Sequence, residues 1–261
     1  MSGVLVIRTP SGLSGDMLLA GLAVMAGEAA DIGSVLAATG LPLPPDAVEI
    51  RPHALQGISG WQARVRLPHE HAHRRLGDIL ALIEASHLSA PAKTVAARAF
   101  TLLAEAEGAV HGRPPGEIAF HEVGALDSIL DTCVAAELLA RIAPDRLVCS
   151  PLPLCDGTVR CAHGPLPTPA PAVQELLRGV PVRGLASTGE TVTPTAIAFL
   201  RAAGFAFGYW PEMVIRQTAR IYGGRVLPEV PNGALFALGD AGLAPVEQRP
   251  KGLTEPGSES T

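Results

Sequence analysis

The chain has few aromatic residues and few charges for its length. Aromatic side chains make up 4% of its 261 residues and charged ones 17%, whereas hydrophobic residues make up 48%. A core of this composition has to be built from Ala, Leu, Val and Ile, and the chain is long enough for one large domain or two small ones. The 28 glycines and 24 prolines fall mostly between apolar runs, where they indicate turns.

Other absences argue against whole classes of protein. No run of Lys and Arg is interleaved with aromatic residues, and the formal net charge is −5, so we expect no nucleic-acid-binding surface. No stretch approaches the roughly 18 uninterrupted apolar residues of a membrane-spanning helix, so we expect no membrane partner. Residues 1–4 carry no basic side chain ahead of the apolar run, so we expect no signal peptide and a cytoplasmic location.

Common catalytic signatures are also missing. The chain has no P-loop, no dinucleotide fingerprint, and no Ser-His-Asp or Cys-His order that stands out. We expect buried thiols rather than disulfides or a zinc site from its four cysteines, which lack C-x-x-C spacing: Cys133, Cys149, Cys155 and Cys161. The chemistry therefore has to be sought in other clusters of polar residues.

Hydrophobic periodicity predicts short strands alternating with apolar helices. Strands are expected at 4–7, 46–53, 60–67, 117–121, 147–149, 158–162, 213–221 and 232–238. Helices are expected at 17–26, 32–38, 76–86, 90–110, 125–142, 172–178 and 194–203. The predicted fold class is α+β, a mixed sheet of short strands packed with Ala- and Leu-rich helices in one compact domain, residues 1–240. The domain could subdivide at the connector 68–75, and residues 241–261 are predicted to be a disordered tail.

The first polar cluster is the turn Ser11-Gly12-Leu13-Ser14-Gly15-Asp16, which separates the first strand from the first helix. A glycine turn at this place exposes backbone N–H groups that can hold a phosphate at the helix end. Ser14 is predicted to cap the helix, and Asp16 suits its positive end. The competing interpretation is a tight turn that needs small residues for steric reasons.

Three histidines at alternating positions form the second cluster: His69, His71 and His73. In an extended chain this spacing places all three imidazoles on one side. Neutral imidazole is favoured by Ni²⁺, Cu²⁺ and Zn²⁺, so the pattern predicts a metal-collecting site. The competing interpretation is a solvated polar linker.

The densest cluster lies just before and inside the predicted helix 125–142, in the segment Phe120-His121-Glu122-Val123-Gly124-Ala125-Leu126-Asp127. A histidine can ligate a metal or shuttle protons, and a carboxylate can orient it or ligate as well. We therefore predict functional roles for His121 and Glu122. Asp127 is equally suited to helix capping, and Asp131 is interpreted as structural.

Two further clusters contain single ligand-capable residues. His163 stands in Cys161-Ala162-His163-Gly164, ahead of a proline-rich run to Pro171 that is predicted to be stiff and extended. Glu190 stands in the glycine loop that leads to Thr193-Pro194, which is predicted to be a helix cap followed by the first helical position. Glu190 could be a metal ligand, a base, or a partner for nearby N–H groups.

Taken together, these segments resemble the LarC family of nickel-insertion proteins, which complete the nickel-pincer cofactor of lactate racemase. The resemblance covers residues 4 to about 239, and its two long stretches, 120–129 and 161–172, are its most specific parts. The other matching stretches are 11–17, 69–73 and 189–195, and all five occur in the family's order. The family has Asp-Cys where this chain has Arg8-Thr9.

The resemblance implies a lyase-class cyclometallase that inserts Ni(II) into pyridinium-3,5-bisthiocarboxylic acid mononucleotide. It implies a requirement for CTP with Mg²⁺ or Mn²⁺, a separate CTP-binding C-terminal chain as partner, and a lactate-racemase-like apoenzyme as recipient of the cofactor. For the mononucleotide phosphate, we assign Ser11, Gly12, Ser14, Gly15 and Asp16. For nickel, we assign His69, His71, His73 and His121.

Final nickel ligation, or acceptance of the proton lost from the pyridinium carbon, is assigned to five residues: His121, Glu122, Asp127, His163 and Glu190. These roles are hypotheses based on side-chain chemistry. Two other functions compete with insertion. One is a non-catalytic nickel carrier that uses the His connector alone. The other is a diverged enzyme for a different phosphorylated molecule, which Arg8 suggests.

Overall fold

The computed structural model describes residues 3–67, 74–120, 124–161, 164–227 and 230–242. Its central element is a mixed sheet of seven strands in the order β11-β6-β1-β13-β12-β3-β2. β1, β6 and β11 run parallel, β13 runs antiparallel to both β1 and β12, and β2 and β3 form a hairpin. The bounds in sheet order are Ala206–Phe207, Arg146–Cys149, Gly3–Arg8, Ala234–Ala241, Met213–Ile221, Ile58–Val65 and Val48–Leu55.

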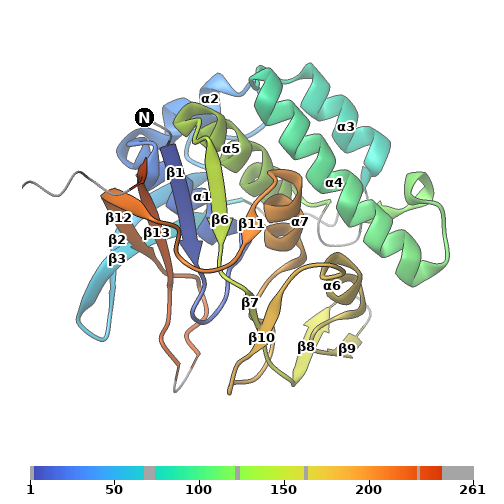
Figure 1. The fold of residues 1–261 in the computed structure, drawn as a ribbon. Coiled ribbons are helices and arrows are strands. Elements are labelled where there is room, and N and C mark those ends of the chain that lie inside the picture. Colours follow the sequence, from blue (N-terminus) through green and yellow to red (C-terminus); the bar gives the residue numbers. More distant parts are fainter. Residues whose placement is uncertain (1–2, 68–73, 121–123, 162–163, 228–229, 243–261) are drawn as a thin grey trace, which may run out of the picture.

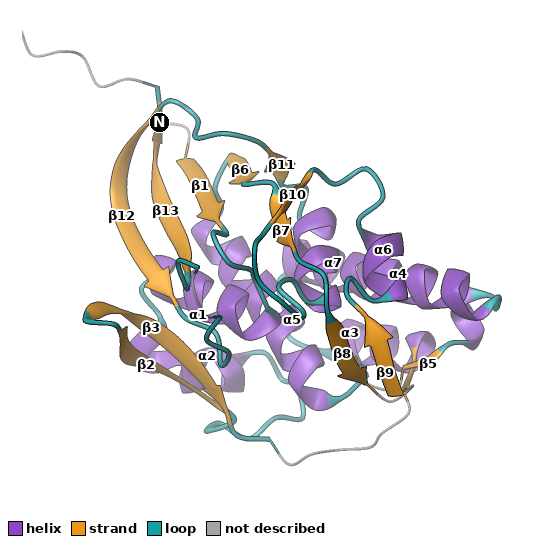
Figure 2. Ribbon diagram, turned by 90° about the horizontal axis from the view of Figure 1, so that it is seen from below, coloured by secondary structure: helices purple, strands orange, loops and turns teal. Residues whose placement is uncertain are grey.

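Figures 1 and 2 show the helices gathered on one side of this sheet. The bounds of α1 to α7 are Gly15–Met25, Ile32–Ala38, Leu76–Ala85, Ala90–His111, Leu126–Ile142, Pro171–Leu176 and Pro194–Ala202. Two short 3-10 turns, Ala29–Asp31 and Pro115–Glu117, connect them. The main core lies between the helices and the sheet, and it is built largely from Ala, Leu, Val and Ile as the composition predicts.

Helix α1 is the innermost helix, packed against β12, β13, β3 and α5. Ten of its eleven residues are buried, so it shows no polar face. A Cβ at Gly21 would lie 2.4 Å from the ring of Phe236 on β13, so a glycine is required for the helix to approach the sheet this closely. This close packing fixes the position of the turn that precedes α1.

The other face of the sheet carries a second, small apolar cluster of Val4, Val6, Val148 and Ala237, against which Met213 packs. The connection from β11 to β12 passes over this face in Figure 1. Arg8 belongs to this side, because its Nη1 donates to the Gly208 carbonyl at 2.7 Å and its guanidinium lies 5.6 Å from the Trp210 ring centroid.

Three two-stranded pairs lie outside the main sheet: β7 (Leu152–Leu154) with β10 (Val182–Gly184), β8 (Thr158–Cys161) with β9 (Gly164–Pro167), and β4 (Arg74–Arg75) with β5 (Ala119–Phe120). Strands were predicted at the positions of β5 and β8, whereas β4, β7, β9 and β10 were not predicted. The run from Gly164 was predicted to be extended, and its first half is an extended strand that pairs with β8, a pairing that was not predicted. Proline is tolerated there because such an isolated pair has outer edges where its missing N–H is not needed.

The predicted fold class is confirmed: the chain forms an α+β domain with a mixed sheet, and the predicted helices and longer strands occur within a few residues of their expected bounds. All four cysteines are free, and Cys133, Cys149 and Cys155 are buried. Within the described ranges, no single helix is both long and apolar enough to cross a membrane. The predicted subdivision point and tail fall mainly outside the described residues.

Candidate functional site

Two of the predicted clusters, separated by more than 170 residues in the chain, lie side by side in the structure. Leu13 forms an isolated parallel β-bridge with Val192. Its N–H donates to the Thr191 carbonyl at 3.0 Å, and its carbonyl accepts from the Thr193 N–H at 3.1 Å. This bridge joins the turn before α1 to the loop before α7.

Gly12 is what allows the two segments to meet so closely. Its φ is +148°, and a Cβ at this position would lie 1.9 Å from the Thr191 carbonyl oxygen. Any other residue would therefore collide with the backbone of the facing loop. The steric interpretation of the glycine turn is correct at this position, and the same contact brings Ser11 and Ser14 next to the loop that contains Glu190.

A cavity of about 250 Å³ opens beside the bridge. Its first wall is the turn before α1, its second is the loop before α7, and its third is the segment that follows β12. The Asn232 side chain closes this third segment, since it accepts from the Leu227 N–H at 2.9 Å and donates to the Leu227 carbonyl at 2.7 Å. The lining residues are Ser11, Gly12, Leu13, Ser14, Met17, Glu190, Thr191, Thr193, Gly223, Gly224, Arg225, Leu227, Asn232 and Gly233.

The start of α1 differs from its prediction. Ser14 occupies the N-cap position, but its side chain makes no capping hydrogen bond. Its hydroxyl instead donates to the carboxylate of Asp16. A carboxylate competes well for a hydroxyl donor because charge-assisted hydrogen bonds are the stronger ones. The first turn of α1 is therefore supplied with a side-chain acceptor by Asp16 rather than by Ser14.

Burial raises the pKa of Asp16, while hydrogen bonds from the Ser14 hydroxyl and from the backbone N–H groups of Met17 and Asp16 itself oppose that rise. These N–H groups belong to the first turn of α1, where an anion would bind at a helix N-terminus. The carboxylate of Asp16 thus already occupies the place that the glycine turn was predicted to offer to a phosphate.

A second carboxyl group lies beside Asp16. Asp131 on α5 packs against α1 so closely that a Cβ at Gly15 would be 2.6 Å from its Oδ2. Its Oδ1 is buried and has no hydrogen-bond partner among the described residues. Burial, followed by the nearby charges of Asp16 and Asp127, raises the pKa of Asp131 well above its ordinary value. The start of α1 is therefore acidic and poorly hydrated.

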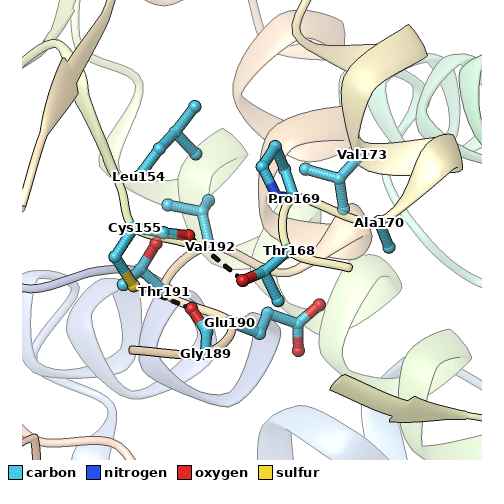
Figure 3. A pocket seen from close by; sticks show the side chains of 10 residues that line it. All are labelled: Leu154, Cys155, Thr168, Pro169, Ala170, Val173, Gly189, Glu190, Thr191 and Val192. Atoms are coloured by element: carbon cyan, nitrogen blue, oxygen red, sulfur yellow. Dashed lines mark hydrogen bonds between the residues drawn. The ribbon is translucent and has the colours of Figure 1, made fainter. Parts of the chain in front are cut away.

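The start of α7 agrees with its prediction. The Thr193 side chain caps the helix by accepting from the Ala196 N–H at 3.3 Å, and Pro194 occupies the first helical position. Just before it, Glu190 lines both the cavity and a narrower pocket, which Figure 3 shows. In that view, the Glu190 carboxylate extends away from Cys155.

Cys155 lines the narrower pocket as a buried thiol. Its Sγ donates to the Gly189 carbonyl at 2.9 Å, and its own carbonyl accepts from Thr168 Oγ1 at 3.1 Å. Burial raises its pKa, the charge of Arg225 lowers it, and Asp156 raises it, with a net rise. Cys155 therefore helps to hold the Glu190 loop in place, and the raised pKa favours its thiol form.

Arg225 is the cation of the cavity, and the sequence analysis did not single it out. Its Nη2 donates to the Thr188 carbonyl at 3.3 Å. It lies over Gly189, where a Cβ would be 2.5 Å from the same nitrogen. The available signal was its position directly after the pair Gly223-Gly224, which leaves the backbone next to the guanidinium free of side chains.

The structure brings together part of the predicted site. Ser11, Gly12, Ser14 and Glu190 line the cavity, and Gly15 and Asp16 lie directly behind Ser14. Asp127 does not line it. That residue is exposed on α5, and its carboxylate accepts from the Ser128 N–H at 2.7 Å. The remaining predicted residues, His69, His71, His73, His121, Glu122 and His163, lie outside the described residues.

Two further observations limit the chemistry that the described residues can perform. Among the residues that the structure describes, no group of three or more His, Cys, Asp or Glu side chains is arranged to hold a metal ion. Arg8, which suggested a different phosphorylated ligand, does not line the cavity but binds Gly208 and Trp210. The presence of Arg8, which suggested an enzyme for a different phosphorylated molecule, is therefore explained by its packing against Gly208 and Trp210.

A polar cavity at the carboxyl end of the parallel strands β1 and β6 is the arrangement in which sheet-containing proteins bind small molecules. Fold and site thus define an α+β domain with a polar cavity beside its central sheet. The family model "Nickel insertion protein" matches residues 5–253, and the chain belongs to this family.

Curated relatives named for nickel insertion match most of the chain. Those from Geotalea daltonii and Syntrophotalea carbinolica are 40% and 39% identical over 230 and 250 residues, which is 88% and 91% of this chain. One from Desulfotalea psychrophila is 40% identical over 225 residues, or 85% of this chain. The chain spans 59%, 60% and 56% of the lengths of these relatives. No solved structure matches the chain.

Proposed function

We propose that this chain is the metal- and substrate-handling part of a nickel-insertion enzyme. The substrate would be pyridinium-3,5-bisthiocarboxylic acid mononucleotide, and the product the nickel-pincer cofactor of a lactate-racemase-like enzyme. The observation that carries the proposal is the Leu13–Val192 bridge, which joins two segments typical of the family around one cavity. The family to which the chain belongs supplies nickel as the metal.

The proposed reaction has a definite balance. Each of the two thiocarboxylate sulfurs forms a bond to Ni²⁺, the C–H bond between them breaks as the Ni–C bond forms, and the proton passes to a base of the protein. Glu190 is suited to the role of base because it is the acidic side chain among the described residues that line the cavity. His121, Glu122 and His163 remain candidates for the same role or for final ligation of nickel.

Nickel delivery and energy supply are assigned to other parts of the protein. The three histidines of the connector, His69, His71 and His73, are proposed to collect Ni²⁺, since neutral imidazole suits this ion. A CTP-dependent step with Mg²⁺ or Mn²⁺ is proposed to reside in the part of the family's length that this chain does not span. The lactate-racemase-like apoenzyme would receive the product.

The direct test is anaerobic mixing of the purified chain, Ni²⁺ and the dithio-mononucleotide, with and without CTP and a candidate C-terminal partner. Formation of the pincer chromophore is expected in the complete mixture. Ni²⁺ uptake without any chromophore, in every combination, would instead indicate a nickel carrier. Absence of both would contradict the proposal.

Variants should localise the chemistry. His121→Ala and Glu122→Ala are each expected to abolish insertion while leaving the melting temperature unchanged, and Glu190→Gln is expected to slow it at least about 100-fold if Glu190 accepts the proton. Glu212→Gln, an exposed acid in the β11–β12 connection, is the matched control and should retain full activity. Full activity of both the His121 and the Glu122 variant would refute their assignment.

A further inference from the structure

The polar groups of the cavity are distributed unevenly, and this distribution bears on where an anionic ligand would bind. On the α1 side, the carboxylate of Asp16 already faces the first-turn N–H groups, and the buried Asp131 lies behind it. A second anion placed there would be repelled by the carboxylate of Asp16. The side formed by Arg225 and the loop before α7 contains the Glu190 carboxylate, but it also holds Arg225, the one cation among the described residues that line the cavity, and its helix end is capped by the neutral Thr193.

Most N–H donors of the Arg225 guanidinium are available to a ligand. A guanidinium carries five N–H donors, and in the described ranges this one makes a single side-chain hydrogen bond, the 3.3 Å contact to the Thr188 carbonyl. The contact comes from the loop that contains Glu190, so it holds the guanidinium at the cavity rim without neutralising its charge. Gly189 leaves room for it, and the Asn232 side chain holds Leu227, two residues after Arg225, through a hydrogen bond from the Leu227 N–H.

Ser11 supplies a second polar side chain to the cavity. The residue is only 7% exposed and lines the cavity. Its hydroxyl is not among the buried side-chain atoms of the described residues that lack a hydrogen-bond partner, so it is not a buried orphan. A serine hydroxyl that lines a cavity can donate to, and accept from, a ligand there.

From this arrangement we infer that the cavity binds a phosphate monoester, with the phosphate on Arg225 and the Ser11 hydroxyl rather than at the N-terminus of α1. The cavity of about 250 Å³ can admit a phosphate with part of the group attached to it. Arg225 can hold two phosphate oxygens at once, which a planar guanidinium does well. This inference rests on the proposed function for the identity of the ligand, and it assigns Arg225 as the residue that recognises the charge.

Binding measurements can test this without nickel. The probes are nicotinic acid mononucleotide, its dephosphorylated riboside and inorganic phosphate, titrated calorimetrically into the full chain. The mononucleotide should bind at least about tenfold more tightly than the riboside, since a charge-assisted contact is worth about 1.5–3 kcal/mol. Inorganic phosphate should compete with the mononucleotide, and higher salt should weaken binding.

Arg225→Gln should abolish the preference for the mononucleotide over the riboside, and Ser11→Ala should reduce it. The matched control is Arg178→Gln, which removes an exposed guanidinium just after α6 that pairs with Glu175 and does not line the cavity. Equal binding of mononucleotide and riboside, or unchanged binding by a folded Arg225→Gln, would overturn the inference. If nickel insertion nevertheless proceeds in that variant, the proposed function stands and only the phosphate site is wrong. If mononucleotide binding depends on Arg225 but no insertion occurs, the phosphate site stands and the proposed function is wrong.

Discussion

The turn before α1 and the loop before α7 are alike in sequence and differ in electrostatics. Each is a glycine-containing segment that ends at a helix, and the two are joined by a β-bridge. The α1 turn contains its own carboxylate, Asp16, and lies against a second carboxyl group, Asp131. The α7 loop also contains one carboxylate, Glu190, but it has a neutral threonine cap and contacts the guanidinium of Arg225. A glycine turn before a helix therefore does not by itself create an anion site, because neighbouring side chains decide the charge.

The largest expected effect comes from disrupting the contact between the turn before α1 and the loop before α7. Gly12→Ala places a methyl group where the Thr191 carbonyl lies and forces an alanine into φ +148°. We expect a loss of about 3 kcal/mol in the free energy of unfolding and loss of mononucleotide binding. Chemical denaturation and calorimetry measure both quantities.

The control for this variant is Gly27→Ala. Gly27 also has a positive φ, +76°, but a Cβ there meets nothing within 4 Å. It should cost only about 1–2 kcal/mol for the backbone conformation and leave binding intact. Equal losses in the two variants would mean that the bridge contributes nothing beyond local backbone strain.

A second prediction concerns the carboxyl groups that surround the turn before α1. The folded-state pKa of Asp131 is raised, first by burial and then by Asp16 and Asp127, so its favourable contribution exists at low pH and is lost as the pH rises from its ordinary value of 3.8 through the raised one. Asp131→Asn removes this ionisation. The stability of the variant relative to the native chain should therefore increase with pH.

Denaturation midpoints measured between pH 4 and pH 8 follow this effect. Asp16 also has a raised pKa, so the pH dependence should shrink in the variant without vanishing. Asp46→Asn, in an exposed turn, should give a profile parallel to that of the native chain. A parallel profile for Asp131→Asn would show that this carboxyl group does not resist ionisation.

The smallest expected effects come from substitutions at the starts of α1 and α7. Thr193→Ala should cost about 1 kcal/mol at any pH, because it removes a neutral cap. Ser14→Ala removes a hydrogen bond to a carboxylate, which favours the charged form of Asp16. Its cost should therefore be present at neutral pH and disappear as Asp16 becomes protonated at low pH. A pH-independent cost in both variants would mean that Ser14 is a conventional cap after all.

Much of the fold could be predicted from the sequence because it depends on local periodicity. The apolar stripe of α5, the alternation in β3 and the Thr193-Pro194 cap are all encoded in neighbouring residues. The short strands β7, β10 and β11 could not be predicted, since pieces of two or three residues become strands only by pairing with distant partners. The same reason explains why Gly164–Pro167 could be predicted to be extended but not to pair with β8.

For the site, the sequence by itself determined the family, and it indicated the segments to which we assign chemistry: the Ser11–Asp16 turn, the Glu190 loop and the histidine-bearing clusters. Only the tertiary structure decided how they are combined. The Leu13–Val192 bridge brings two of them together, α5 places Asp131 beside Asp16, and the segment after β12 adds Arg225. Side-chain type is a local property, whereas burial and the sign of the neighbouring charge are set by residues more than a hundred positions away.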